Sequence, residues 1–232
     1  MSAKHNPKKV LLAGLAMMIV FAVVLVGVFL PLFKGQNGLD YLDNLYNSIS
    51  KQSAYYIPDL SKAAQRYAGQ PIKAELKLAS EAQAAQAALL FTAAGASVQR
   101  QGSDLTLQGD LGKILAASLG DADAMFHNNG KALVARYPGQ NERAMIYAWW
   151  LSFQALEKDL NRQKAFAQAK FVQTVQAKAV EMAYNYYGIQ PQSIGERWAV
   201  VVFSLLFYVI YTLWYGYGVM YLFEGAGFRM GH

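Results

Sequence analysis

The chain has 232 residues, of which 54% are hydrophobic, and its formal net charge is +6. The positive charge is divided between a short basic start and an otherwise balanced middle, with no concentrated basic face, which argues against a nucleic-acid partner. Because the chain contains no cysteine, disulfides, thiolate metal sites and c-type haem are excluded.

Two long apolar runs predict membrane-spanning helices. Residues 10–33 and 198–223 contain no charged side chain. A helix rises about 1.5 Å per residue and the hydrocarbon core is about 30 Å thick, so each run can cross a bilayer with some tilt. We place the spans at 10–33 and 196–223. The first run is longer than a signal-peptide core of about 7–15 residues and lacks an A-x-A site, which favours an uncleaved anchor.

Basic residues at the chain ends set the expected orientation. Lys4, Lys8 and Lys9 precede the first span, and the positive-inside rule places such a segment in the cytoplasm. Two spans return the C-terminus to the same side, in agreement with Arg229. We therefore expect a two-pass protein of the bacterial inner membrane, with two cytoplasmic ends and a periplasmic middle. The cytoplasmic ends are residues 1–9 and 224–232, and the periplasmic middle is residues 34–197.

Between the spans, the hydrophobic period changes from helical to alternating and back. Residues 34–70 predict helices, with Pro58 suited to a first turn and Gly69 to a stop. The alternating stretch IKAELKL predicts a half-buried strand. A helix after the Ser80 cap, two short strands (SVQRQ and LTLQ), a helix capped by Asp110 and a last strand, KALVARY, are expected to follow.

The order strand–helix–strand–strand–helix–strand is the split βαβ plan of ferredoxin-like folds. The expected fold class is therefore membrane α+β: two transmembrane helices flank an extracytoplasmic domain with helices and a small ferredoxin-like (βαββαβ) sheet at 71–138. This fold hosts many functions, so it implies none.

The segment 139–195 is predicted to be largely helical. No glycine or proline occurs from Glu142 to Tyr187, which allows either one rod of about 69 Å or a helical hairpin broken near Asn161. Trp149 and Trp150 point about 100° apart around such a helix, so both cannot easily enter one small core. One of the two, Trp149 or Trp150, is therefore a candidate partner contact, since tryptophan is favoured at interface hot spots.

The second span carries a candidate packing face. Small and hydroxylated residues recur there every four positions, which places them on one side of a helix and suits close helix–helix packing. Two alternatives remain open: the face packs on the first span, or it packs on another membrane subunit. The residues are Ser204, Tyr208, Thr212 and Gly216.

Residue patterns for catalysis are sparse. The three histidines, His5, His127 and His232, all lie outside the spans, and no acidic or basic residue lies inside either apolar run, 10–33 or 198–223. We find no Gly-rich phosphate loop and no G-x-S-x-G motif. We therefore expect no catalytic residue, no cofactor and no metal ligand.

These patterns predict a non-catalytic accessory or scaffold subunit of a multi-protein inner-membrane complex. Its expected partners are other membrane subunits and the lipid bilayer, and a homo-oligomer is compatible with the sequence. An extracytoplasmic ligand sensor is one alternative function, although only nine residues lie beyond each span to pass a signal inward.

The order anchor, α/β domain, long helix, anchor resembles the layout of the polysaccharide co-polymerases that govern chain length. The resemblance implies a self-assembling periplasmic scaffold as an alternative function. The chain departs from that family's pattern at the entry to the second span, which is proline-rich in the family and has only Pro191 here. The middle domain is also short for the family.

Overall fold

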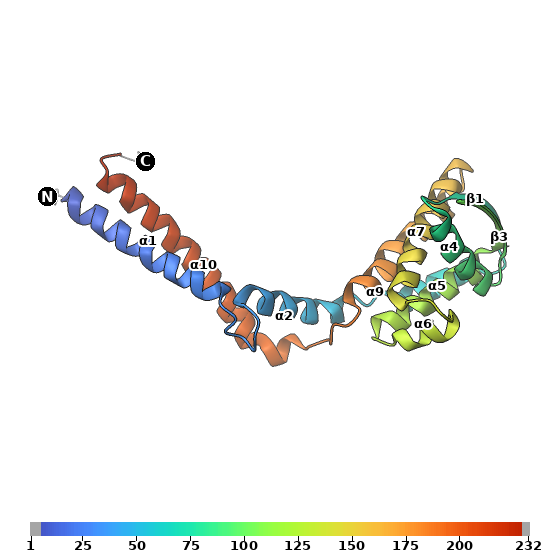
Figure 1. The fold of residues 1–232 in the computed structure, drawn as a ribbon, viewed down its shortest axis with the longest axis horizontal. Coiled ribbons are helices and arrows are strands. Elements are labelled where there is room, and N and C mark those ends of the chain that lie inside the picture. Colours follow the sequence, from blue (N-terminus) through green and yellow to red (C-terminus); the bar gives the residue numbers. More distant parts are fainter. Residues whose placement is uncertain (1–5, 229–232) are drawn as a thin grey trace. The chain divides into compact units, whose positions relative to one another are not determined.

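The computed structural model describes residues 6–228 and divides the chain into two compact units (Figure 1). We call residues 6–49 with 191–228 the span unit, and residues 50–190 the sheet unit. Four residues used in the sequence analysis lie outside the described residues: Lys4, His5, Arg229 and His232.

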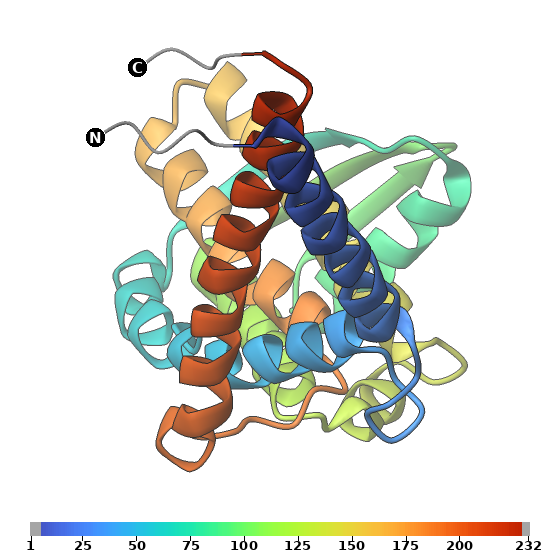
Figure 2. The ribbon, with the colours of Figure 1, turned by 90° about the vertical axis from the view of Figure 1, so that its left-hand side faces the viewer.

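Two long apolar helices make up most of the span unit. Helix α1 is Pro7–Phe29 and helix α10 is Ile194–Gly225. They lie side by side and antiparallel, as Figure 2 shows. Each is long and apolar enough to cross a membrane.

Helix α1 ends earlier than the apolar run that predicts it. The run extends to Phe33, but Leu30 is already extended, with a ψ of 147°. Leu30 precedes Pro31, and the proline ring disfavours helical backbone at the residue before it. A short turn closed by backbone hydrogen bonds between Phe33 and Gln36 follows.

Glycines allow α1 and α10 to approach closely. A Cβ atom built on Gly14 would lie 2.8 Å from the backbone nitrogen of Leu222, and one on Gly225 would lie 2.5 Å from the Cα of Leu11. Gly218 and Gly225 are one heptad apart, the repeat expected where two helices pack with a left-handed crossing.

Helix α2, Gly38–Ser53, begins in the span unit and ends in the sheet unit. The side-chain oxygen of Asn37 accepts a hydrogen bond from the Asp40 backbone N–H at 2.8 Å, which caps the helix start. Within the span unit, the hydroxyls of Tyr46 and Ser204 are 2.7 Å apart and hydrogen-bonded, which ties α2 to α10.

The sheet unit contains three antiparallel strands in the order β1-β3-β2. They are β1 Pro71–Lys77, β2 Ser97–Gln101 and β3 Asp104–Asp110. Gly102, with a φ of +62°, occupies the tight turn between β2 and β3, where a left-handed conformation favours glycine. These three strands confirm the alternating pattern read from the sequence.

One face of the sheet is covered and the other is polar. Leu76 pairs with Leu105, and Ala74 pairs with Leu107, and all four are buried. Helices pack on this apolar side (Figure 1). They are α4 Glu81–Ala93 and α5 Leu111–Phe126. Helix α3 Ile57–Ala64, with the 3₁₀ turn η1 Gln65–Tyr67 after it, packs on α5.

The predicted fourth strand is wrong. The segment KALVARY lies in helix α6, Gly130–Arg136, so the ferredoxin-like plan is not completed. Leu133 and Tyr137 are both buried and one helical turn apart, so a helix places both in the core.

The free edge of β1 is covered by a helix. Asp159 accepts a hydrogen bond from the Glu75 backbone N–H at 3.1 Å, and Gln163 donates one to the Lys73 carbonyl at 2.8 Å. Side chains four residues apart on a helix thus satisfy the strand groups that a fourth strand would pair with.

The long helical segment forms a hairpin. Helix α7 is Glu142–Arg162, and the return arm runs through α8 Phe166–Val175, the π-helical turn η2 Gln176–Val180 and α9 Glu181–Tyr186. The chain reverses at Lys164, whose φ is +62°. The hairpin alternative is therefore correct, and the break follows Asn161 closely.

Candidate functional site

The predicted packing face of α10 does not have uniform surroundings. Ser204 is buried and bonded to Tyr46. Tyr208 is 69% exposed, Thr212 is exposed, and a Cβ built on Gly216 would meet no atom within 4 Å. Three of the four residues therefore form an open face, which we call the Tyr208–Gly216 face.

Helix α1 contacts a different side of α10. The Tyr211 hydroxyl donates to the Phe21 carbonyl at 2.8 Å, and the Trp214 indole donates to the Met17 carbonyl at 2.9 Å. The rings of Phe21 and Tyr211 stack with centroids 4.3 Å apart. The polar tips of Tyr211 and Trp214 are thus satisfied by the backbone of α1.

The Tyr208–Gly216 face is not satisfied in the same way. The Thr212 hydroxyl donates to the Tyr208 carbonyl at 2.7 Å, so it is satisfied within its own helix. Among the described residues, no hydrogen bond is recorded for the Tyr208 hydroxyl. Tyr208 lies near the middle of the 32-residue helix, far from either end.

The two tryptophans of α7 differ in exposure. Trp149 is fully buried against Phe91 and Phe153, so it is a core residue with no surface for a partner. Trp150 is partly buried, stacks on Tyr147, and donates to Glu181 at 3.2 Å. Of the two candidate contacts, only Trp150 reaches the surface.

A buried carboxylate organises the centre of the sheet unit. Asp121 is fully buried and accepts hydrogen bonds from Arg136, from the Tyr137 hydroxyl at 2.6 Å and from the Trp149 indole at 2.7 Å. Burial, followed by the hydrogen bond to Asp121, raises the pKa of Tyr137. Sequence reasoning missed this cluster because its members lie on three helices up to 28 residues apart.

A buried lysine joins the two ends of the sheet unit. The Lys51 ammonium donates to the Ile189 carbonyl at 2.7 Å, the Tyr186 carbonyl at 3.0 Å and the Asn128 side chain at 3.3 Å. Burial lowers the pKa of Lys51. Since Lys51 lies at the start of the unit and Ile189 near its end, this cluster is structural: it holds together the places where the chain enters and leaves.

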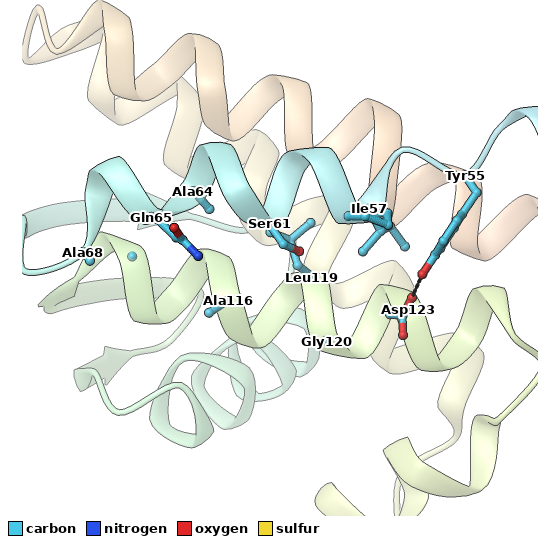
Figure 3. A pocket seen from close by; sticks show the side chains of 12 residues that line it. Tyr55, Ile57, Ser61, Ala64, Gln65, Ala68, Ala116, Leu119, Gly120 and Asp123 are labelled. Carbon is cyan, nitrogen blue, oxygen red and sulfur yellow. Dashed lines mark hydrogen bonds between the residues drawn. The ribbon is translucent and has the colours of Figure 1, made fainter.

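A groove lies between α3 with its following turn and α5 (Figure 3). Its volume is about 470 Å³, within the range of about 300–1,000 Å³ that small-molecule sites occupy. Small residues form much of its lining, including Ala64 and Ala68 from the α3 side and Ala116 and Gly120 from α5. We call this cavity the α3–α5 groove.

One end of the α3–α5 groove carries a polar cluster. The Tyr55 hydroxyl donates to Asp123 at 2.6 Å, as Figure 3 shows. Burial, and then this hydrogen bond, raise the pKa of Tyr55 to about 12, so the phenol remains a donor at neutral pH. The His127 ring nitrogen Nδ1 donates to the Asp123 backbone carbonyl at 2.9 Å, and the same nitrogen lies 3.4 Å from Oδ1 of the Asp123 carboxylate.

No group of three or more His, Asp and Glu side chains suited to a metal ion occurs within residues 6–228. Comparisons with known proteins give no family: no protein-family model, curated protein or solved structure matches this chain. The functional proposals below therefore rest on contacts, burial and chemistry in the described part of the chain.

Proposed function

We propose that the chain is a non-catalytic accessory or scaffold subunit of a multi-protein inner-membrane complex, anchored by α1 and α10. The observation that supports it is the Tyr208–Gly216 face, which lies on a different side of α10 from the hydrogen bonds and glycines that contact α1. This face combines a missing side chain, a hydroxyl without a recorded partner and a position deep in the apolar helix.

A second membrane helix suits this face for two physical reasons. A phenol hydroxyl in hydrocarbon lacks water to bond with, so an acceptor on a neighbouring helix stabilises it by about 1 kcal/mol. Gly216 provides an unfilled position that lets another backbone approach, and dispersion energy grows with such contact.

Extraction in mild detergent followed by sizing and identification of the co-eluting proteins tests the proposed function. We expect the chain to elute in a complex with other membrane proteins. A lone monomer would contradict the proposal, and a ring of identical chains would replace it with the self-assembling scaffold.

Gly216→Leu is expected to release the partner subunits. The leucine side chain would occupy the gap that a partner helix needs, while the span itself still inserts because leucine is favourable in lipid. Tyr208→Phe should weaken binding less, by about 1 kcal/mol, the scale of one intramembrane hydrogen bond. Recovery of partners with each purified variant is the measurement.

The matched control is Ala199→Leu, which adds similar bulk at an exposed position about 100° around α10 from Gly216. It should retain every partner. If Gly216→Leu and Ala199→Leu retain partners equally, the face meets only lipid and the proposed contact is incorrect.

We further propose that both chain ends are cytoplasmic and that the sheet unit is periplasmic. Lys8 and Lys9 at the start of α1 support this orientation. Alkaline phosphatase is active only outside the cytoplasm, so a fusion at Gly102, in the exposed turn between β2 and β3, should be active and one at the C-terminus silent. A silent Gly102 fusion with normal expression would reverse the orientation.

A further inference from the structure

We propose that the α3–α5 groove binds a small organic cation, with an ammonium head beside Asp123 and a short apolar body along the groove. This inference goes beyond the proposed function, because it concerns the sheet unit alone and needs no partner subunit. It stands on the closure of the groove, on its single charge and on the way that charge is held.

The groove is closed at both ends, which favours a small molecule over a peptide. At one end α5 touches the α3 side so closely that a Cβ on Gly112 would lie 2.6 Å from the Cα of Ala68. At the other end the Tyr55–Asp123 hydrogen bond crosses from one wall to the other (Figure 3). A continuous chain could not run through without breaking one of these contacts.

The lining has one charged side chain, so its charge complements a monocation. Among the described residues of the lining, Asp123 is the only ionisable acid or base apart from the Tyr55 phenol, which burial and the hydrogen bond keep protonated at neutral pH because they raise its pKa. The side chain of Asp123 is 43% exposed, so a ligand can reach it. Ala68 and Ala116 offer exposed apolar surface further along the groove, and a hydrocarbon body that covers them would be removed from water.

The carboxylate is also pre-positioned. The Tyr55 hydroxyl donates to Oδ1 of Asp123 at 2.6 Å, and Nδ1 of His127 lies 3.4 Å from the same oxygen, whereas no described residue donates a hydrogen bond to Oδ2. A fixed carboxylate with one oxygen available is the arrangement that an incoming ammonium N–H needs. Ser61 and Gln65 add neutral polar groups on the α3 wall.

The test uses the full chain in nanodiscs of zwitterionic lipid, with the alanine methyl groups labelled for NMR. Butylammonium, 1-butanol and butyrate are titrated at pH 8, where imidazole is ordinarily uncharged. We expect the methyl signals of Ala64, Ala68 and Ala116 to shift, with a Kd for butylammonium about tenfold below that for butanol. Butyrate should bind weakest.

Two variants separate charge from shape. Asp123→Asn keeps an acceptor for Tyr55 and should remove the preference for the cation. Gly120→Leu fills the groove, since a Cβ there meets no atom within 4 Å, and should weaken both butylammonium and butanol about tenfold or more. Leucine also favours the helix more than glycine, so folding should be retained.

Ala82→Leu, on the exposed start of α4 and outside the groove lining, is the control and should bind both probes as the unmodified chain does. Unchanged alanine signals outside the groove show that each variant is folded. No shift with any probe, equal affinity for butylammonium and butyrate, or undiminished binding in Gly120→Leu would each overturn the proposal.

Discussion

Asp121→Ala is expected to lower the free energy of unfolding of the sheet unit by about 3–5 kcal/mol. Removal of the carboxylate leaves the buried Tyr137 hydroxyl and Trp149 indole N–H without an acceptor, at about 1–3 kcal/mol for each. It also removes the ion pair with Arg136, which joins α6 to α5. The total free energy of unfolding of a domain of this size is about 5–15 kcal/mol, so the variant should be close to unfolding.

Urea unfolding followed by tryptophan fluorescence measures this effect, because Trp149 is itself a partner of Asp121. Asp121→Asn preserves the shape of the side chain and one acceptor oxygen, so it should lower the free energy of unfolding less than Asp121→Ala does. Asp104→Ala, at an exposed position at the start of β3, is the control and should change stability by no more than about 0.5 kcal/mol. Equal midpoints for Asp121→Ala and Asp104→Ala would show that the buried cluster contributes little.

Gly14→Leu is expected to separate α1 from α10. Its side chain would begin 2.8 Å from the Leu222 nitrogen and 3.0 Å from the Tyr221 carbonyl carbon, and backbone atoms cannot turn aside as a side chain can. The helices must therefore move apart, with a loss of about 1–3 kcal/mol of packing. The hydrogen bonds from Tyr211 and Trp214 to the backbone of α1 should weaken with it.

A disulfide reports this separation cleanly, because the chain has no cysteine of its own. A Cβ on Gly218 would lie 3.6 Å from the Cβ of Met17, within the range of about 3.5–4.5 Å that disulfides require. Met17→Cys with Gly218→Cys should therefore cross-link readily, and adding Gly14→Leu should reduce the yield several-fold.

Gly27→Leu is the matched control on the same helix, since a Cβ there meets no atom within 4 Å. It should leave the cross-link unchanged. A high yield with Gly14→Leu would mean that the two helices pair elsewhere than at these glycines.

The α10 face shows where a local pattern and a packed structure differ. Residues four apart drift by about 40° per step around a helix, so Ser204 and Gly216 are separated by about 120°. Two packed helices follow a seven-residue repeat instead, which drifts by only about 20°. The contact with α1 therefore follows Tyr211, Gly218 and Gly225, while Gly216 turns away from it.

The missing fourth strand has a similar cause. KALVARY is seven residues long and mostly apolar, and such a run does not distinguish a strand from a buried helix turn. The choice depends on whether a sheet edge is available. Asp159 and Gln163 already occupy the edge of β1, and Asp121 on α5 binds Tyr137 at the end of α6, so the helix is the arrangement that fits.

By itself, the sequence determined the elements whose signals are local. Runs without charge predicted α1 and α10, a two-residue period predicted β1, and Ser80 and Asp110 marked helix starts that the structure confirms. These signals depend on neighbours within about one or two helical turns, so they survive without knowledge of the fold.

Only the tertiary structure decided which surfaces meet. The Asp121 cluster, the Lys51 contacts and the α3–α5 groove each join residues about 30 to 140 positions apart, and one sequence holds no local record of such pairings. Trp149 illustrates the reason: its position beside Trp150 suggested an interface, but a buried carboxylate on another helix makes the core the place where its indole N–H is satisfied.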